Sequence, residues 1–397
     1  MSVANQRLKV LIAGILSLLT MVGVARFAYT PILPVMQAEA GLSMAGGGWL
    51  AASNYFGYFT GAIIAASVSN LTLKDHFYRL GLILAILTTV AMGLTESVWW
   101  WAFWRYIAGL AAACGLLIGS GLVMHWLVSN SMRPELGIHF MGLGGGVALA
   151  AVVAELMLGA FDWREQWFIY TALAAVMAIP AWVWLPKPNL SGVTANGKKL
   201  ADRPPGRTFY NLMMIAYFCA GVGYAVITTF IVAHINQISG EGGAFAFMLI
   251  GIAAAPAPMA WDFITRRIGF INALCLAFIM QLIGSVLPFL HDAAGWAYAG
   301  ALIFGSSFVG IVSMILTMAG RFYPTQPAKM MGKMTLSYGL AQILAPAGGG
   351  LLSAWSGNYF SSLYMASTVM AIGLLLMLII KYWVPVFADD APATEPL

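Results

Sequence analysis

A charged side chain stands inside the first long apolar segment of the chain. Arg26 lies in the stretch 23–36, GVARFAYTPILPVM, beside Tyr29, Thr30 and two prolines. A charge near the centre of a bilayer costs at least ~2.5–3.5 kcal/mol on insertion scales, so intramembrane charges commonly serve a function. A guanidinium can bind both oxygens of a carboxylate. We therefore predict that Arg26 faces a cavity and binds an anion or a buried carboxylate; the alternative is a salt bridge that only fixes this helix.

Two further ionisable residues lie within apolar segments. Glu155 stands near the end of the fifth segment, and His234 stands in the seventh. A buried carboxyl group or an imidazole can take up and release a proton near neutral pH. Both are therefore candidates for proton coupling. The alternatives are that Glu155 pairs with Arg164 at the outer surface and that His234 is structural.

The composition requires a membrane. The chain has 397 residues, of which 61% are hydrophobic and only 8% are charged, and its mean hydropathy is +0.86. A soluble protein is about 25% charged. At ~20 residues per crossing, the length accommodates about twelve transmembrane helices in an all-α polytopic fold. The apolar runs place these helices at 8–36, 44–70, 76–95, 97–128, 135–160, 164–186, 208–237, 243–264, 269–290, 294–320, 329–354 and 358–385.

The distribution of lysine and arginine predicts the orientation. If the N-terminus is cytoplasmic, all but three of the 19 basic residues fall on the cytoplasmic side. The exceptions are Arg164 in an outer loop, and Arg26 and Arg105 within helices. Cytoplasmic loops carry an excess of positive charge, so we predict that both termini are cytoplasmic.

Several classes of protein are disfavoured by what the sequence lacks. The three cysteines lie far apart in apolar segments without metal-binding or CxxC spacing, so they are expected to pack as small core residues. We find no Walker motif, metal cluster or nucleophile–base set, so we expect neither an enzyme nor a cofactor or bound metal. No basic stripe with aromatic residues indicates nucleic acid. No cleaved signal peptide is evident. The expected partners are a small molecule, protons and lipid, and the expected state is a monomer.

The chain divides into two related halves around one long polar stretch. We predict an N-terminal six-helix bundle at 1–186, a cytoplasmic linker at 187–207, a C-terminal six-helix bundle at 208–385 and a cytoplasmic tail at 386–397. A shift of 198 residues lays GVGYAVITTFI onto GVARFAYTPIL without a gap, which places Tyr224 at the position of Arg26. Two parallel six-helix repeats are the pattern of major facilitator transporters.

A short segment after the eighth helix carries a family signature. WDFITRRIGFINA contains Asp262, Arg266, Arg267 and Gly269 in the order D-x-x-x-R-R-x-G. This order resembles the cytoplasmic signature of the major facilitator superfamily. The resemblance implies a latch that stabilises the outward-facing state. The stretch 23–36 further resembles the bacterial YbfB/YjiJ-type branch of this superfamily.

The corresponding N-terminal copy of the signature departs from the family pattern. It reads SNLTLKDHFYRLG, with Asn70 where the family has an aspartate and Lys74 as a possible basic partner. The five glycine-rich positions 142–146, GLGGG, lie in the fifth helix, and small residues let helices approach closely. We expect the eighth helix to be the partner of these glycines.

The same resemblance assigns roles to residues in the fourth helix and to the deeper tyrosines. Arg105 and Gly109 resemble the fourth-helix motif, in which the arginine is linked to proton coupling or substrate contact. Alternatively, Arg105 could extend outward to the membrane surface. The tyrosines that family analogy places along the substrate path are Tyr29, Tyr55, Tyr58, Tyr224 and Tyr338.

These features together predict a multi-pass secondary transporter of the bacterial inner membrane. We expect alternating access, a small organic anion as substrate, Arg26 as the anion-binding residue and Arg105 as a modulator of the site. Glu155 or His234 would carry a proton. The first alternative is a proton-driven exporter of hydrophobic or cationic compounds. The second is a receptor or scaffold that retains the fold without transport.

Overall fold

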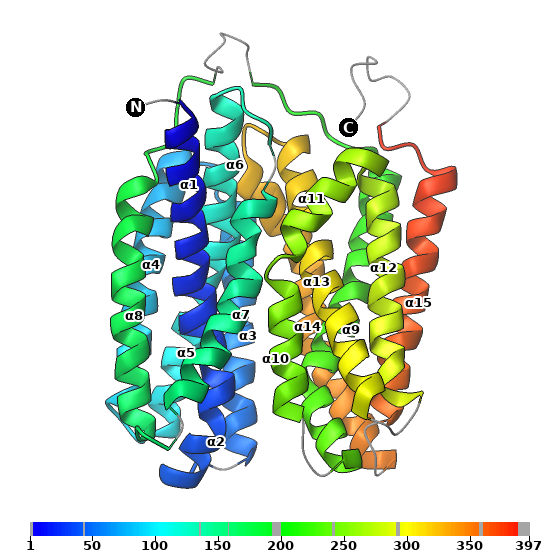
Figure 1. Cartoon of the computed structure of the whole chain (residues 1–397). Coiled ribbons are helices and arrows are strands. Elements are labelled where there is room, and N and C mark those ends of the chain that lie inside the picture. Colours follow the sequence, from blue (N-terminus) through cyan, green and yellow to red (C-terminus); the bar gives the residue numbers. More distant parts are fainter. Residues whose placement is uncertain are drawn as a thin grey trace. The chain divides into compact units, whose positions relative to one another are not determined.

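The structure is a computed structural model that describes residues 3–42, 44–134, 136–157, 159–192, 200–239, 243–290, 294–356 and 360–387. Every regular element in these ranges is a helix (Figure 1). Nine helices of the described chain are long and apolar enough to cross a membrane, and a bent helix pair would make ten. The prediction of an all-α, multi-pass membrane protein is therefore confirmed. The count of twelve and the orientation stay predictions, because α3 and α14, at the predicted spans 44–70 and 329–354, are not among these nine.

The chain forms two compact units. One contains residues 1–201 and 324–333, and the other contains residues 202–323 and 334–397. The short segment 324–333 belongs to the first unit because its backbone packs closely there. A Cβ atom on Gly332 would lie 2.6 Å from the Ala66 main-chain nitrogen, for example.

The first unit contains the following elements, the two labelled η being π-helices: α1 (Val3–Leu18), η1 (Leu19–Phe27), α2 (Tyr29–Glu39), α3 (Met44–Ser67), α4 (Leu71–Gly93), α5 (Val98–Ala113), η2 (Cys114–Gly119), α6 (Ser120–Ser129), α7 (Gly137–Met157) and α8 (Trp163–Trp184). The first span is continuous through α1, η1 and α2, and its η1 segment packs against α4, α5, α7 and α8. η1 is therefore a central element of the unit. Seven of its nine residues precede Arg26, and six of those seven are buried.

Glycines let the first span and α7 approach closely. A Cβ atom on Gly23 would lie only 2.7 Å from Gly146 Cα, and one on Gly142 would lie 2.7 Å from the Ile15 carbonyl oxygen. Gly145, which lies between them in sequence, has only an ordinary 3.7 Å contact with Leu19. The glycine-rich stretch therefore does serve close packing, and the helix that Gly142 and Gly146 contact is the first one. The expected approach of this stretch to the eighth helix stays a prediction.

The second unit contains the following helices, η3 being a 3₁₀ turn: α9 (Arg207–Ser239), α10 (Gly243–Ala254), α11 (Ala257–Ile268), α12 (Phe270–Val286), η3 (Leu287–Phe289), α13 (Ala294–Phe322), α14 (Pro327–Ser356) and α15 (Phe360–Trp383). The prediction of one helix over 243–264 is wrong. This span is broken after Ala254, and α10 and α11 meet at an angle of 44°. Pro256 at the break has no N–H group to donate and its ring crowds the preceding turn, which favours a break at this point.

Candidate functional site

Arg26 lies near the end of the π-helix and is surrounded by aromatic rings. Its guanidinium carbon is 4.6 Å from the ring centre of Tyr58, 5.1 Å from that of Tyr55 and 5.4 Å from that of Phe27. No hydrogen bond or ion pair of this side chain exists within the described part of the chain. The aromatic faces therefore stabilise the charge without neutralising it.

The Arg26 guanidinium also opens on accessible space. The residue is only 6% exposed, yet none of its nitrogens is among the fully enclosed polar atoms that lack a partner in the described residues. The hydrogen-bond donors of Arg26 are therefore both unused and reachable. This is the geometry that an anion-binding arginine needs, and it places three of the predicted site residues, Arg26, Tyr55 and Tyr58, in contact.

Arg105 has a different environment. Its Nη1 donates to the Ala25 carbonyl oxygen at 2.9 Å, and its Nη2 donates to the Arg26 carbonyl oxygen at 3.1 Å. The guanidinium also lies over the Tyr29 ring at 4.6 Å, and the residue is 3% exposed. Arg105 therefore neither extends to the membrane surface nor presents its charge to open space. It holds the backbone on which Arg26 stands.

These two carbonyls lie where the hydrogen-bond pattern of the first span changes. At its end, the Ala28 N–H is shared between the Gly23 carbonyl at 3.1 Å and the Val24 carbonyl at 3.3 Å. In a π-helix each N–H donates to the carbonyl five residues earlier, and in an α-helix to the carbonyl four residues earlier. The change between the two therefore displaces the donors by one residue along the chain. Pro31 follows five residues after Arg26 and has no N–H to offer to it. Arg105 supplies donors where the first span changes its hydrogen-bond pattern.

Helix α3 fixes the other side of this arrangement. The Tyr29 hydroxyl donates to the Gly47 carbonyl at 2.8 Å, and the Asn54 side-chain amide donates to the Arg105 carbonyl at 2.8 Å. A Cβ atom on Gly109 would collide with the Asn54 carbonyl oxygen, so α3 and α5 touch through their backbones. The structure therefore brings together all five N-terminal residues of the predicted site. Asn54 was not predicted, although an asparagine within an apolar segment was its visible signal.

The two tyrosines predicted in the second half form part of an aromatic stack. Tyr338 lies 4.6 Å from Tyr217 and 5.7 Å from Tyr224, measured between ring centres. Tyr224 continues onto Phe308 at 5.1 Å, and Phe308 continues onto Phe304 at 5.4 Å. Sequence reasoning found Tyr224 and Tyr338 but missed the other three rings. The second unit thus contains a buried stack of five aromatic rings, the aromatic ladder.

The predicted latch residues lie at the junction of α11 and α12. Gly269 joins the two helices with φ +80°, a conformation that favours glycine. Arg266 Nε donates to the Asp262 carbonyl oxygen at 3.2 Å, and the Arg267 guanidinium lies 4.5 Å from the Phe263 ring centre. The conformational role of these residues stays a prediction.

The N-terminal copy contains a charged pair that the sequence reading did not single out. Asn70 caps α4 by accepting the Leu73 N–H at 3.0 Å. Asp75 Oδ2 accepts from Arg79 Nε at 3.0 Å. Lys74, which was considered as a basic partner, is fully buried, and its ammonium has no partner in the described chain. The charged pair at this position is therefore Asp75 and Arg79, whose i, i+4 spacing was its signal.

The side chains of Glu155 and His234 lie outside the described residues, so their predicted proton-coupling role is untested. A different histidine is enclosed in the first unit. His139 Nε2 lies 2.7 Å from the Ser120 hydroxyl, and Nδ1 has no hydrogen-bond partner among the described residues. The structure buries His139 completely.

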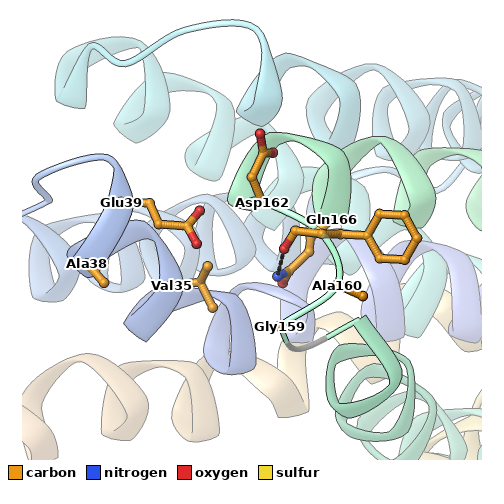
Figure 2. Close-up of a pocket in the computed structure, with 8 residues that line it drawn as sticks. Val35, Ala38, Glu39, Gly159, Ala160, Asp162 and Gln166 are labelled. Carbon is orange, nitrogen blue, oxygen red and sulfur yellow. Dashed lines mark hydrogen bonds between the residues drawn. The ribbon is translucent and has the colours of Figure 1, made fainter.

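A pocket of about 510 Å³ near the start of α8 contains two carboxylates (Figure 2). The Glu39 side chain accepts the Trp163 main-chain N–H at 2.9 Å, and Asp162 accepts two N–H groups of the first turn of α8. Gln166 donates to the Phe161 carbonyl at 3.0 Å. These groups satisfy one another and the helix terminus, so we assign them to the cap of α8.

Comparison with known proteins places this architecture in a family. Residues 18–380 match the family described as "Uncharacterised MFS-type transporter YbfB". The chain belongs to this major facilitator family. The predicted superfamily and its YbfB-type branch are therefore confirmed, and with them a multi-pass membrane transporter.

Individual relatives agree with this assignment. The uncharacterized MFS-type transporter YhhS of Escherichia coli CFT073 is 27% identical over 297 residues, which cover 72% of this chain and 66% of that protein. The uncharacterized MFS-type transporter YceJ of Bacillus subtilis is 22% identical over 89% of this chain and 85% of that protein. The crystal structure of the human organic anion transporter MFSD10 (TETRAN) superposes with a TM-score of 0.70 at 14% identity, covering 95% of this chain and all of that one. At this identity the structural likeness concerns the fold.

Proposed function

We propose that this protein is a secondary active transporter that moves a small carboxylate-type organic anion across the bacterial inner membrane by alternating access, driven by protons. Arg26 binds the carboxylate through two parallel hydrogen bonds. The observation that carries the proposal is a buried guanidinium that is unneutralised but reachable. Such a group favours an anion, because the ligand supplies the missing acceptors and the missing charge.

The aromatic cage around Arg26 supports this role. Cation–π contacts contribute about 0.5–2 kcal/mol each, and they leave the N–H donors at the edge of the guanidinium unused. The faces of Tyr55 and Tyr58 therefore lower the cost of keeping a charge in a largely buried site. A carboxylate partner in place of the rings would lower that cost too, but it would compete with an anionic substrate.

Arg105 acts in this proposal as a positioning residue. Its Nη1 and Nη2 donate to the Ala25 and Arg26 carbonyls, so it orients the end of the π-helix and with it the Arg26 side chain. Tyr29, which lies under Arg105 and is tied to α3, stabilises the same backbone. Substrate contact is assigned to Arg26, Tyr55 and Tyr58.

The test uses purified protein and three arginine variants. A thermal-shift screen against organic acids, amino acids and drugs identifies ligands, and uptake into proteoliposomes follows. We expect Arg26→Ala to weaken binding about thirtyfold or more, because losing one partner of a buried charge pair costs roughly 2 kcal/mol or above. Arg26→Lys should retain only part of the affinity, since an ammonium lacks the two-pronged geometry.

The matched control is Arg164→Ala, which removes an arginine that pairs with Glu96 away from this site. It should leave ligand binding unchanged. Equal binding and uptake by wild type, Arg26→Ala and Arg26→Lys would refute the anion-binding role.

Proton coupling is tested separately. Uptake is measured under an imposed pH gradient with and without a protonophore, and the Glu155→Gln and His234→Gln variants are measured in the same way. Uptake that ignores the gradient would refute coupling.

The aromatic ladder in the second unit favours a second function, export of hydrophobic or cationic compounds. Planar apolar or cationic molecules stack on ring faces such as those of Tyr224, Tyr338 and Phe308. This function predicts protection of cells against dyes or antibiotics, indifference to organic acids and sensitivity to Tyr338→Ala. The same ligand screen therefore distinguishes the two functions.

A further inference from the structure

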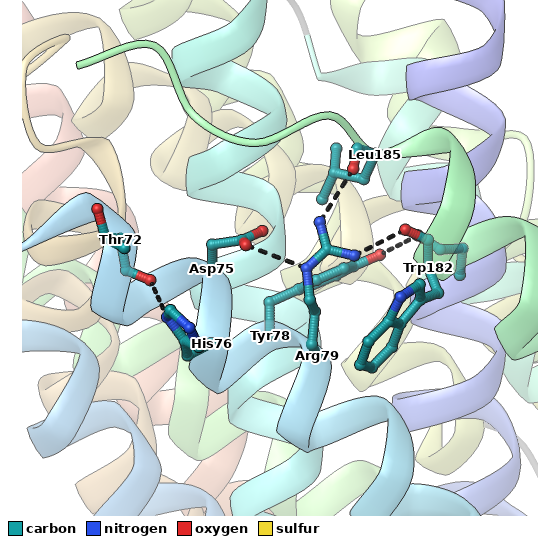
Figure 3. Close-up of polar contacts among 8 residues, drawn as sticks. Thr72, Asp75, His76, Tyr78, Arg79, Trp182 and Leu185 are labelled. Carbon is teal, nitrogen blue, oxygen red and sulfur yellow. Dashed lines mark hydrogen bonds and ion pairs between the residues drawn. The ribbon is translucent and has the colours of Figure 1, made fainter.

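A groove of about 830 Å³ lies between the start of α4 and the segment that follows α8. Figure 3 shows Thr72, Asp75, His76 and Arg79 of α4 on one side of this region and Trp182 and Leu185 on the other. The groove lies away from Arg26 and plays no part in the function proposed above. Its two walls differ in chemistry.

The wall of the groove that continues along the helices is apolar and faces outward. Leu80 and Ile83 of α4 are 47% and 44% exposed, and Trp182 near the end of α8 is 38% exposed. Both helices are long and apolar enough to cross a membrane. Exposed apolar side chains on such helices lie against acyl chains, so this wall offers a track for a hydrocarbon tail.

The wall at the helix ends is cationic, and three hydrogen bonds hold its Arg79 side chain in place. Arg79 Nε donates to Asp75 at 3.0 Å, Nη1 donates to the Trp182 carbonyl at 2.9 Å, and Nη2 donates to the Leu185 carbonyl at 3.3 Å (Figure 3). A guanidinium has five N–H donors, so two remain after these three bonds. The guanidinium is thus held rigidly with donors to spare.

Lys187 is the second cation of the groove, and the segment that carries it is tied down on both sides. Arg79 binds the Leu185 carbonyl before it, and His125 Nε2 lies 2.9 Å from the Asn189 carbonyl oxygen after it. Lys187 itself is exposed, and no ion pair of its ammonium exists among the described residues. The backbone therefore places a free ammonium at a defined position beside the groove.

The charges around the groove do not balance. Arg79 and Lys187 contribute two positive charges and Asp75 one negative charge. The buried ammonium of Lys74, next to Asp75 in the chain, adds a further positive charge without a partner in the described residues. An apolar track that ends in an uncompensated cationic rim matches a molecule with a hydrocarbon tail and an anionic head.

We propose that this groove binds an anionic phospholipid, phosphatidylglycerol, from the leaflet that this end of the unit faces. The phosphate lies against Lys187 and the remaining N–H groups of Arg79, and one acyl chain lies along Leu80, Ile83 and Trp182. The predicted orientation puts this end on the cytoplasmic side, where basic clusters beside a membrane helix attract anionic headgroups. The lipid thereby adds to the hydrogen bonds by which Arg79 of α4 already holds the end of α8.

The experiment measures lipid binding to the full-length, delipidated protein in a neutral detergent. Phosphatidylglycerol, phosphatidylcholine and free glycerol phosphate are titrated separately, with the unfolding temperature and native mass spectrometry as readouts. We expect phosphatidylglycerol to raise the unfolding temperature and to remain bound, and phosphatidylcholine to do so weakly. Free glycerol phosphate should have little effect, because it lacks the tail that the apolar wall binds. An effect of glycerol phosphate equal to that of the lipid would refute the lipid as the occupant.

Two variants and a matched control locate the binding to this groove. Lys187→Glu should weaken phosphatidylglycerol binding by about fivefold or more, given the usual contribution of one basic residue near anionic lipid. Leu80→Asn, which makes the apolar wall polar while leaving the cations in place, should weaken it as well. The control is Lys381→Glu, which alters another exposed lysine at a helix end, with its ammonium over Tyr382. Equal binding by Lys187→Glu and Lys381→Glu, or equal responses to the two phospholipids, would overturn the proposal.

Discussion

The close approach between η1 and α7 gives a sharp test of how the first unit is packed. Replacing Gly146 with alanine adds one methyl group whose carbon would lie 2.7 Å from Gly23 Cα and 3.1 Å from the Gly23 nitrogen. Both neighbours are backbone atoms, so no side-chain rotation can relieve the overlap. The two helices must move apart, and η1 carries Arg26.

The neighbouring Gly145 provides a control that separates the cost of the packing overlap from the effect of alanine on helix stability. Forcing an extra carbon into a packed interior costs typically ~1–3 kcal/mol. Alanine also favours a helix over glycine by about 1 kcal/mol, which partly offsets that cost. Gly145→Ala gains the same helical preference but adds only an ordinary 3.7 Å contact with Leu19. The helical preference cancels between the two variants, so their stabilities should differ by ~1–3 kcal/mol, with Gly146→Ala the less stable.

Thermal unfolding of both purified variants in the same detergent provides the measurement. For a domain of this size, 1 kcal/mol corresponds to roughly 2–4 °C in the unfolding temperature. Gly146→Ala should therefore unfold at least ~2 °C below Gly145→Ala, and it should also bind ligand more weakly if Arg26 is displaced. Equal unfolding temperatures, or a lower one for Gly145→Ala, would refute the packing described for η1 and α7.

Two further predictions concern charges in the first unit. Lys74→Met should raise the free energy of unfolding by at least about 1 kcal/mol, because it replaces a fully buried ammonium, unpartnered in the described chain and repelled by Lys329, with an apolar side chain of similar length. Thermal unfolding of this variant is compared with that of Lys329→Met. A loss of stability specific to Lys74→Met would show that the ammonium has a counter-charge. Asp162→Ala should lower the free energy of unfolding by ~1 kcal/mol, since it removes the side chain that accepts two N–H groups at the start of α8. Asp162→Asn keeps an acceptor and should lower it less. Chemical denaturation measures both variants, and wild-type stability in both would contradict this expectation.

The sequence was sufficient to predict the membrane class and the positions of most helices, because length and hydropathy are properties of short windows. It was also sufficient to select Arg26, since a charge in an apolar run is visible without a structure. The break at Pro256 was visible too, but two prolines in an apolar segment are compatible with either a kink or an end. Only the arrangement of α10 and α11 decides between them.

The role of Arg105 could not be predicted, because its partners are main-chain carbonyls. The sequence reading weighed substrate contact against extension to the membrane surface. Neither alternative considers a guanidinium that binds the main chain of a neighbouring helix. The acceptors at Ala25 and Arg26 lie near the end of η1, and no residue type in LTMVGVARF signals a π-helix. The fully buried Lys74 was similarly hidden, since burial at a helix end depends on neighbours far away in the chain.

The π-helix also limits what internal symmetry says about this protein. By residue number, the 198-residue shift pairs Arg26 with Tyr224, which lies in the uninterrupted α-helix α9. A π turn closes one residue later than an α turn, so side chains along Leu19–Phe27 progressively leave the phase of a regular helix. Aligning the two stretches by residue number therefore does not align the faces of their helices from Leu19 onward. An arginine introduced at position 224 would therefore leave its helix in a direction different from that of Arg26.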